Sequence, residues 1–325
     1  MYFNLLRTMF SLKKRHDYPM YSMTYYGDYG FDEFITQGAT NDEDLLQFIQ
    51  ARLTRRKRIG INTPNSGCTT FTARDSNGDI LYGRNYDFPA TPSLVVKTNP
   101  KSGYASISVV DLMALGFSPK NLPEGKMSKK LPLLASPYLP FDGMNEKGLA
   151  IAILQVPKSD LPNDPGKITL NTTATLRLLL DKAATVSEAI ELLGKYNIYF
   201  SYNVYCHYFI ADASGKSVIV EYHNNKMNVT EENTASNFYA CNTKLALDDP
   251  GEVPTPHERY DMVKEKLLQQ SGVLSMSEAG KLLCDLGIYD DTKNILQWSV
   301  VYNLSALTGM VFPGRDMSKP YLFRV

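Results

Sequence analysis

A cysteine, an arginine and a carboxylate stand in an order that would bring them together if two neighbouring strands pair. The stretch 67–74 contains Thr and Phe, which favour a strand. An Asn-Gly pair within residues 76–79 can supply the positive φ of a tight hairpin, and the return strand then reaches Arg84 and Asp87. Because a hairpin brings the start of one strand near the end of the next, we expect Cys68 to lie close to Arg84 and Asp87. A thiol beside a fixed cation favours the thiolate, which is the nucleophilic form.

Each of these residue types also has a purely structural interpretation. A lone Cys is usually a small buried hydrophobe, and an Arg followed three positions later by an Asp commonly forms a surface ion pair. Short motifs of this kind occur by chance, so residue types alone do not separate a reactive site from an ordinary hairpin. Further motifs in a fixed order along the chain are needed to decide.

Further motifs of this kind are present. Cys-Thr-Thr-Phe from Cys68 and Gly-Arg-Asn-Tyr-Asp-Phe from Gly83 resemble the start of the mature chain in the choloylglycine hydrolase group. This group includes bile salt hydrolases and penicillin V acylases, and it is similar to acid ceramidase and penicillin acyltransferases. All are N-terminal nucleophile (Ntn) hydrolases. Arg84 and Asp87 stand at the family's spacing from Cys68, and the block Asp-Gly-Met-Asn-Glu-Lys-Gly-Leu-Ala at 142–150 is also similar. The resemblance runs from Cys68 to near the C-terminus and points to the superfamily, not to a substrate.

The order of predicted elements agrees with the fold that this resemblance implies. Alternation and turn residues predict strand-rich hairpins near both ends of the chain and paired helices in the middle. The expected fold class is therefore α+β, a four-layer αββα Ntn-hydrolase sandwich of two antiparallel sheets. Before the hairpin, the expected elements are a strand at 21–26 and a helix at 41–53 with basic residues at 52–58. After it, we expect strands at 93–97 and 104–110, a polar loop at 118–130, a buried strand at 149–156, and helices at 172–184 and 186–195 with Thr185 as a cap. The remaining expected elements are a hairpin of 205–211 and 217–222, a strand end at 238–242, helices at 256–270 and 275–286, strands at 298–304 and 309–312, and a last segment at 320–325 that closes a sheet edge.

The position of Cys68 inside the chain has a consequence for mechanism. In an Ntn hydrolase the free α-amine of the first residue assists its own side chain. Its pKa of about 7.7–8.0, against about 8.5 for a free thiol, lets it act as a base near neutral pH without a His. Here the bond between Gly67 and Cys68 must first be cut, and the family does this when the thiol attacks the preceding carbonyl. We expect the loop 62–67 to leave that bond accessible.

The same consequence divides the chain in two. Residues 1–67 are predicted to be a propeptide or a retained segment before the nucleophile, and residues 68–325 the Ntn-hydrolase catalytic domain. The helix predicted at 41–53 indicates that the first segment folds. Whether it is removed, retained or left uncleaved stays open.

The resemblance implies roles for three further residues. Gln155 stands where the family tends to have a polar side chain near the oxyanion, typically Asn in bile salt hydrolases and Tyr in penicillin V acylases, so a backbone N–H is the alternative donor here. Asn242 falls where the family has an Asn whose amide donates to the oxyanion. Arg259 matches a family Arg that reaches the nucleophile from a helix start. A turn residue and a surface Arg are the structural alternatives for Asn242 and Arg259.

The leading hypothesis is a cysteine Ntn hydrolase that cleaves the linear, non-peptide amide of a small N-acyl substrate after self-cleavage between Gly67 and Cys68. An acyltransferase would use the same acyl-enzyme with an amine in place of water. A different class of enzyme, a papain-like protease, would pair Cys68 with His207. A binding protein that kept the fold would have an unreactive Cys68. The order of Cys68, Arg84, Asp87, Asn242 and Arg259 argues against the last of these.

The composition limits the kinds of partner and cofactor that we expect. Lys plus Arg and Asp plus Glu both number 34, so the net charge is zero and no nucleic-acid partner is indicated. The four Cys and four His show no metal-ligand spacing, and the resemblance implies no cofactor. At the N-terminus the basic residues follow the apolar ones, which is not the order in a signal peptide. We therefore expect no membrane span and a cytoplasmic protein. The oligomeric state stays open, and a homo-oligomer is among the alternatives because family members are often tetramers.

Overall fold

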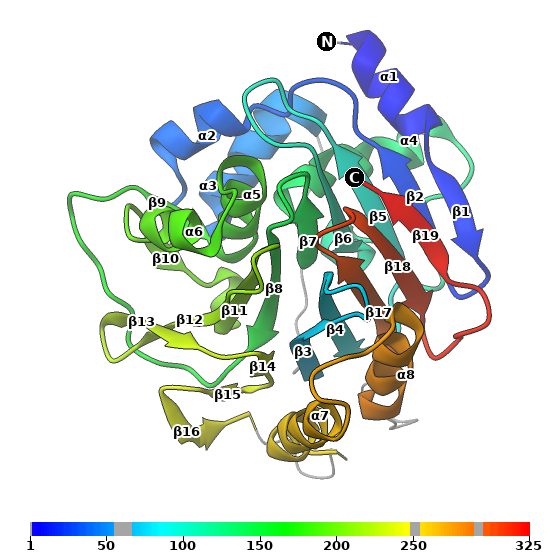
Figure 1. The fold of residues 1–325 in the computed structure, drawn as a ribbon. Helices are drawn as coiled ribbons and strands as arrows, with labels where there is room; N and C mark the ends of the chain where they lie inside the picture. The colour runs from blue at the N-terminus through cyan, green and yellow to red at the C-terminus, as the bar shows by residue number, and fades with distance from the viewer. Residues whose placement is uncertain (1, 55–66, 248–253, 289–294) are drawn as a thin grey trace.

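Two large β-sheets pack face to face and carry helices on their outer faces (Figure 1). The computed structural model describes residues 2–54, 67–247, 254–288 and 295–325. The basic residues predicted at 55–58 and most of the loop predicted at 62–67 therefore lie outside the described residues, although Gly67 itself lies inside them.

The larger sheet has nine strands and collects segments from the whole first two thirds of the chain. All its neighbouring strands are antiparallel except β2 and β5, which pair in parallel. Its strands, in spatial order, are β1 (Lys13–His16), β2 (Met20–Thr24), β5 (Ser93–Thr98), β6 (Ser106–Asp111), β7 (Asp142–Asn145), β8 (Ala150–Gln155), β11 (Cys206–Ala211), β12 (Ser217–His223) and β13 (Lys226–Glu231).

The smaller sheet has six strands and joins the predicted hairpin around Cys68 to the C-terminal strands. It is antiparallel throughout. Its strands, in spatial order, are β14 (Thr234–Ala235), β3 (Gly67–Arg74), β4 (Ile80–Phe88), β17 (Ile295–Asn303), β18 (Thr308–Pro313) and β19 (Tyr321–Arg324).

Eight α-helices and two short sheets complete the described residues. The helices are α1 (Tyr2–Phe10), α2 (Phe31–Gln37), α3 (Asp42–Ile49), α4 (Met127–Lys130), α5 (Thr172–Lys182), α6 (Val186–Leu193), α7 (Pro256–Gln269) and α8 (Met276–Leu286), and the two-stranded sheets pair β9 (Thr169–Asn171) with β10 (Asn197–Tyr199) and β15 (Phe238–Tyr239) with β16 (Asn242–Ala246). Short 3₁₀ segments at Leu112–Leu115, Leu131–Tyr138 and Ser201–Asn203 and one π-helical turn at Gln50–Thr54 join them.

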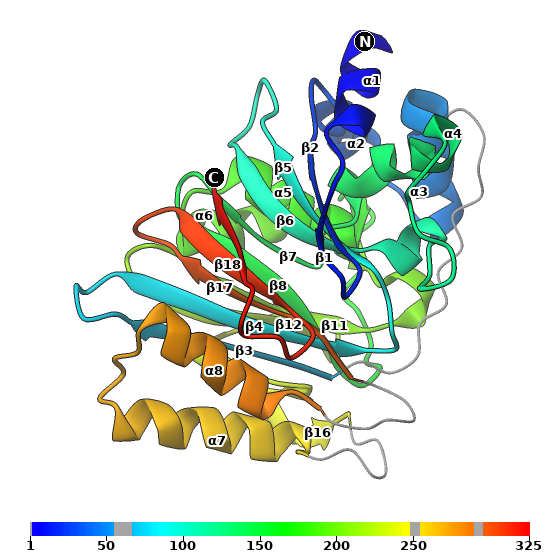
Figure 2. The same cartoon turned by 90° about the vertical axis from the view of Figure 1, so that its right-hand side faces the viewer.

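Three hydrophobic layers hold these elements together. The middle layer lies between the two sheets and includes Cys68, Tyr82 and Trp298. An outer layer packs α5, α6 and the N-terminal segment on the nine-stranded sheet. The other outer layer packs α7 and α8 on the six-stranded sheet, and Figure 2 shows these two helices side by side on that face. The predicted αββα sandwich is confirmed.

Three expectations differ in detail. The larger sheet is mixed near one edge, because β2, which comes from the N-terminal segment, pairs in parallel with β5. The polar loop predicted at 118–130 ends in a short helix, α4. The strand end predicted at 238–242 is two strands, β15 and β16, that reverse direction at residues 240–241. Thr185 caps α6 as predicted, with its side chain accepting the N–H of Glu188.

The segment before Cys68 is part of the sandwich. Its strand β2 pairs with β5 over five residues, and its aromatic residues Tyr29, Phe31 and Phe34 are buried against Tyr138. The Tyr29 hydroxyl donates to the buried Asp181 carboxylate at 2.7 Å. Segments on both sides of Cys68 therefore share one hydrophobic core.

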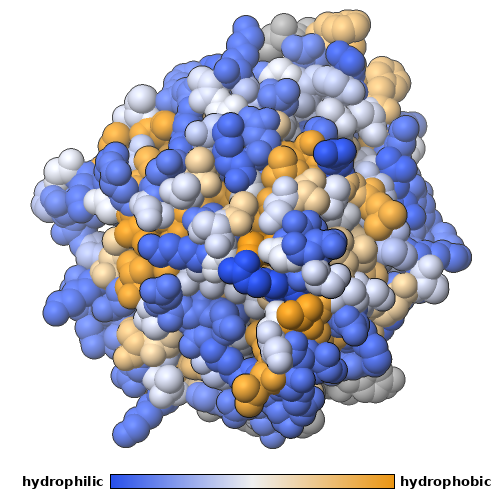
Figure 3. Space-filling model, viewed as in Figure 1, coloured by the Kyte–Doolittle hydropathy of each residue, from blue (hydrophilic) through white to orange (hydrophobic). Residues whose placement is uncertain are grey.

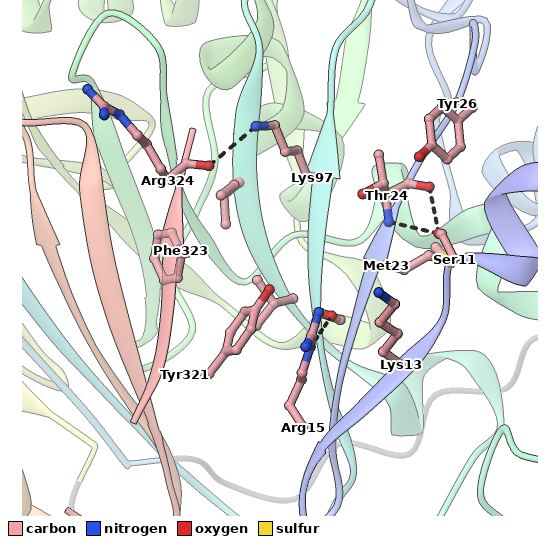
Figure 4. Close-up of a pocket in the computed structure, with 13 residues that line it drawn as sticks. Ser11, Lys13, Arg15, Met23, Thr24, Tyr26, Lys97, Tyr321, Phe323 and Arg324 are labelled. Carbon is pink, nitrogen blue, oxygen red and sulfur yellow. Dashed lines mark hydrogen bonds between the residues drawn. The ribbon is translucent and has the colours of Figure 1, made fainter. Parts of the chain in front are cut away.

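Strands of the two segments also enclose a cavity of about 250 Å³ between the edges of the two sheets (Figure 4). Lys13, Arg15 and Tyr26 line it from the N-terminal segment, and Lys97 and Tyr321 line it from the rest of the chain. The guanidinium of Arg15 lies 4.8 Å from the ring centre of Tyr321, so contacts across the cavity tie the first strands to the last one.

The molecular surface is mixed in character. Figure 3 shows one face on which hydrophilic residues predominate and hydrophobic residues form small groups between them. Among the described residues, no helix combines the length and the apolar character that crossing a membrane requires.

The buried ion pair on α5 gives a test of this packing. The Arg177 guanidinium donates to Asp181 at 3.0 Å, and both side chains are almost completely buried. We predict that Arg177→Ala lowers the free energy of unfolding by about 3–5 kcal/mol, because it leaves the Asp181 carboxylate buried without its cation. Urea unfolding followed by tryptophan fluorescence measures this.

The control is Lys195→Ala, which removes an ion pair of the same spacing with Glu191 on an exposed face. It should leave the urea midpoint nearly unchanged. Equal effects of the two substitutions would contradict the burial of the Arg177 network.

Candidate active site

The hairpin of β3 and β4 places Cys68 in the interior of the sandwich. Cys68 pairs with Tyr86, and Gly67 pairs with Asp87. Only 2% of Cys68 is exposed and Gly67 is also buried, so the bond between them is not accessible in the intact chain, contrary to the expectation for the preceding loop. Strand alternation turns Arg84 and Tyr86 toward the same face as Cys68 and turns Asp87 to the opposite face.

Arg84 lies beside the thiol. Its Nη2 is 3.9 Å from the Cys68 Sγ and donates to the carbonyl of Ile153 at 3.3 Å. Its guanidinium carbon also lies 4.8 Å from the ring centre of Tyr86. Burial opposes the charged form of Arg84, but the negative groups around it outweigh burial and raise its pKa. A permanent cation in a dry site next to the sulfur favours the thiolate.

Asp142 neutralises that cation. Its carboxylate lies 3.2 Å from Arg84 Nη1, and neither side chain is exposed. The indole N–H of Trp298 donates to it at 3.0 Å and the Tyr302 hydroxyl at 2.6 Å. Asp142 begins the family-like block at 142–150, but its residue type and spacing predict no role for it. The ion-pair partner of Arg84 is Asp142, not Asp87.

Asp87 lies behind the backbone of residues 67–68. Its Oδ1 accepts the N–H of Ile288 at 2.9 Å. A Cβ added to Gly67 would come within 3.2 Å of the Asp87 Cβ and 2.1 Å of the Ile288 Cδ1. Asp87 therefore flanks the bond that precedes Cys68 and approaches the backbone from the side opposite to the thiol.

Asn237 contacts the nitrogen of Cys68 directly. Its side chain is buried, its Oδ1 accepts the Cys68 N–H at 2.6 Å, and its Nδ2 donates to the carbonyl of Gln155 at 2.8 Å. The neighbouring Ser236 hydroxyl donates to the Cys68 carbonyl at 3.2 Å. Ser236 and Asn237, which are consecutive in the chain, thus hold the backbone of Cys68 on both sides of its Cα.

Asn242, the residue predicted from the sequence, lies elsewhere. It begins β16 and its side chain is exposed, whereas Cys68 is buried. The two asparagines flank the same short strand, β15, and face different environments because the chain reverses at residues 240–241. Nothing in the residue types separates them, since each is an Asn beside the Phe-Tyr strand. The structure brings Asn237 to Cys68 and leaves Asn242 at the surface.

Arg259 is buried in the first turn of α7 and fixes the orientation of Asn237. Its Nη2 donates to Asn237 Oδ1 at 2.8 Å, and its Nε donates to the Thr69 hydroxyl at 3.1 Å. A guanidinium has only donors, so the Asn237 oxygen must face Arg259 and Cys68, and the amide nitrogen must face Gln155. Arg259 is thus linked to the Cys68 nitrogen through Asn237.

Gln155 ends β8, and its side chain is half-buried. Its backbone makes the contacts that concern the site. The carbonyl accepts from Asn237, and the residue pairs with Cys206 across the sheet. The contact with Asn237 involves the carbonyl of Gln155, whereas the sequence-based alternative was a backbone N–H donor to the oxyanion, so that alternative stays a prediction.

His207 does not pair with the thiol. Its Nδ1 lies 3.0 Å from Oε1 of Glu221, and its buried Nε2 has no hydrogen-bond partner within the described parts of the chain. The arrangement therefore gives no support to a Cys-His dyad. In the described part of the chain no group of three or more His, Cys, Asp or Glu side chains could hold a metal ion.

Comparison with known proteins gives a family match and several relatives. The model of the family described as linear amide C-N hydrolases, choloylglycine hydrolase family, matches residues 68–242. The bile salt hydrolase/transferase of Clostridium perfringens (strain 13 / Type A) is 29% identical over 178 residues, which cover 51% of this chain and 51% of that protein. The match thus spans about half the length of that relative.

Solved structures show the same fold. A mutant conjugated bile acid hydrolase from Clostridium perfringens has a TM-score of 0.57 at 17% identity, covering 79% of this chain and 92% of that one. Penicillin V acylase from Agrobacterium tumefaciens has a TM-score of 0.56 at 19% identity, covering 79% and 85%. At such identities the likeness concerns the fold alone.

The buried pair of Arg84 and Asp142 leads to a prediction. Arg84→Met should lower the free energy of unfolding by about 3–5 kcal/mol, because Asp142 is left buried without its cation. Adding Asp142→Leu should recover part of this loss, since the unpaired charge is then gone. The measurement is urea unfolding of the two single variants and the double variant, all with Cys68→Ala so that thiol chemistry plays no part. Additive single effects would contradict the pairing.

Proposed function

The chain belongs to the choloylglycine hydrolase family of linear amide C-N hydrolases, and from this premise we propose that it is a cysteine Ntn hydrolase that cleaves the amide of a small N-acyl substrate. One observation carries the proposal. The backbone nitrogen of Cys68 is held by Asn237 at 2.6 Å while its thiol lies beside the buried guanidinium of Arg84. The thiol and the nitrogen that would become the α-amine thus each have a polar partner.

The proposed reaction begins with the chain itself. The Cys68 thiol attacks the Gly67 carbonyl and the C–N bond breaks, which leaves Gly67 as a thioester on the sulfur and frees the α-amine of Cys68, where the thiol proton ends. Water then hydrolyses this thioester, which releases the Gly67 carboxylate and restores the thiol. In turnover that amine takes the thiol proton as the sulfur attacks the substrate carbonyl. The proton passes to the leaving amine as the C–N bond breaks. Water, activated by the α-amine, then hydrolyses the thioester, releases the carboxylic acid and restores the thiol.

The contacts support a role for each neighbour. Arg84 stabilises the thiolate, and Asp87 flanks the backbone where the α-amine forms. Asn237 takes the part that sequence reasoning gave to Asn242, with its amide nitrogen directed toward residue 155. Arg259 holds Asn237 in that orientation.

We further propose that residues 1–67 stay bound after cleavage. The pairing of β2 with β5, the bond from Tyr29 to Asp181 and the contact of Arg15 with the Tyr321 ring at the cavity in Figure 4 support this, because each of them joins the two sides of the cleaved bond. Losing the first segment would expose the edge of β5 and a large aromatic surface.

An acyltransferase is the second candidate. Both reactions pass through the same thioester, and they differ only in whether water or an amine attacks it. One relative, the bile salt hydrolase/transferase, carries both activities in its name, and this favours the second candidate. The substrates in the names of the relatives, bile salts and penicillin V, are starting points for a panel of N-acyl amides.

The first test is the intact mass of the purified protein under denaturing conditions. We predict a fragment that begins at Cys68 in the wild type and an uncut chain for Cys68→Ala. Cys284→Ala is the matched control because Cys284 is partly exposed on α8 and lies outside the site, so it should be cut like the wild type. An uncut wild-type chain that nevertheless hydrolyses N-acyl amides would overturn the α-amine mechanism.

The same sample tests retention of the first segment. Under native conditions the two fragments should elute together in size-exclusion chromatography, and urea should separate them. Light scattering on the eluting peak gives the number of copies in the particle. A native peak that lacks residues 1–67 but stays folded would contradict the proposed retention.

The two asparagines give a paired prediction. Asn237→Ala should slow self-cleavage and amide hydrolysis by roughly 10²–10³-fold, the usual effect of removing one positioned polar group from such a site. Asn242→Ala should leave both rates close to those of the wild type. Rates from quenched mass spectrometry and from product release test this, and the reverse ranking would restore the original assignment.

A further inference from the structure

Glu221 is a buried carboxylate in the middle of the nine-stranded sheet's strand β12. By strand alternation it shares a face of β12 with Ile219, which lies in the layer between the sheets, while Val218, Val220 and Tyr222 face the helices. Glu221 is completely buried. A buried carboxylate is costly unless its oxygens are satisfied, so its hydrogen-bond partners indicate what it holds in place.

Its partners are the backbone of the turn that follows Asn237. Oε1 accepts the N–H of Ala240 at 2.7 Å and the bond from His207 at 3.0 Å, and Oε2 accepts the N–H of Cys241 at 2.9 Å. Burial alone would raise the pKa of Glu221, but His207 and the two N–H groups outweigh it and lower that pKa. The carboxylate thus accepts hydrogen bonds from one side chain, His207, and from the backbone of the turn at 240–241.

The turn needs such an anchor. β15 and β16 share only two residue pairs with an irregular register, and the residues from 241 to 244 are exposed. A two-stranded ribbon of this length is not stable by itself. The turn nevertheless has to hold Asn237, whose Oδ1 is 2.6 Å from the Cys68 nitrogen.

We propose that Glu221, oriented by His207, is a positioning residue for the active site: it fixes the turn at 240–241 and thereby sets Asn237 against Cys68. His207 reaches Glu221 from β11, the neighbour of β8, and β8 supplies the Gln155 carbonyl that accepts from Asn237. Strands of the same nine-stranded sheet therefore hold both the amide of Asn237 and the turn at 240–241. This role explains why the chain has a buried histidine near the site that does not bond to the thiol.

The substitutions follow from the donor pattern. Glu221→Gln has nearly the same shape but presents an amide N–H₂ to a site where every partner is a donor. His207→Leu removes the bond to Glu221, whereas His207→Asn can still donate from a position close to that of Nδ1. Asp212→Asn is the control, because Asp212 is a buried carboxylate at the other end of the same hairpin that accepts the N–H of Val186 and Ser214.

The first readout is independent of activity. In the Cys68→Ala protein, the side-chain amide resonance of Asn237, assigned by its loss in Asn237→Ala, should shift in Glu221→Gln and His207→Leu. It should return toward the original position in His207→Asn and stay unchanged in Asp212→Asn. An unshifted Asn237 resonance in Glu221→Gln would overturn the positioning role even if that variant is less stable.

The second readout rests on the proposed function. Glu221→Gln should slow self-cleavage by about 10²-fold, the scale of a small misplacement of reacting groups. In an Asn237→Ala background the same substitution should add almost nothing, because its effect passes through Asn237. Full additivity would contradict the proposal. If the wild type neither cleaves itself nor hydrolyses amides, the proposed function fails, and the resonance shift still decides whether Glu221 positions Asn237.

Discussion

The buried charge of Arg84 is the constraint on which the rest of the site depends. A guanidinium in the layer between two sheets is tolerated only if a carboxylate and hydrogen bonds compensate it. Asp142 supplies the carboxylate from the nine-stranded sheet, and Trp298 and Tyr302 of the six-stranded sheet hold that carboxylate in turn. The two sheets therefore cannot slide past each other without breaking this cluster. The interaction that places a cation beside Cys68 is also one that fixes the sandwich.

The position of Cys68 at the start of β3 follows from the same architecture. The thiol faces the core between the sheets and Arg84, while the backbone of residues 67–68 meets Asp87 on the other face. Turn residues from outside the hairpin then hold the Cys68 nitrogen and carbonyl. Side chain and backbone of one residue are thus controlled by separate elements, which lets the thiol and the nitrogen be oriented independently.

The sequence was sufficient where local patterns determine the outcome. The hairpin around Cys68, the αββα layers and the Thr185 cap follow from strand alternation, turn residues and capping, and each is present. Asn237, which contacts the Cys68 nitrogen, was missed because residue types do not predict the chain reversal at 240–241 that separates it from Asn242. Asp142 was missed because its partners lie on strands distant in sequence. The parallel pairing of β2 with β5 was likewise not predicted, since it joins segments that are far apart in the sequence and that no local pattern connects.

The proposed self-cleavage and the proposed turnover cannot use the same base. In the intact chain the Cys68 nitrogen is an amide, whose N–H donates to Asn237, so it has no lone pair with which to accept the thiol proton. It becomes a base only after the bond to Gly67 is cut. What the two reactions share is therefore the part of the site that does not change on cleavage: the cation of Arg84 beside the sulfur and the Asn237 amide held by Arg259. If these fixed groups act first on the chain itself, the sheets need no rearrangement before the site acts on a second amide. The buried partners of Arg84 and Asn237 then keep the geometry the same in self-cleavage and in turnover.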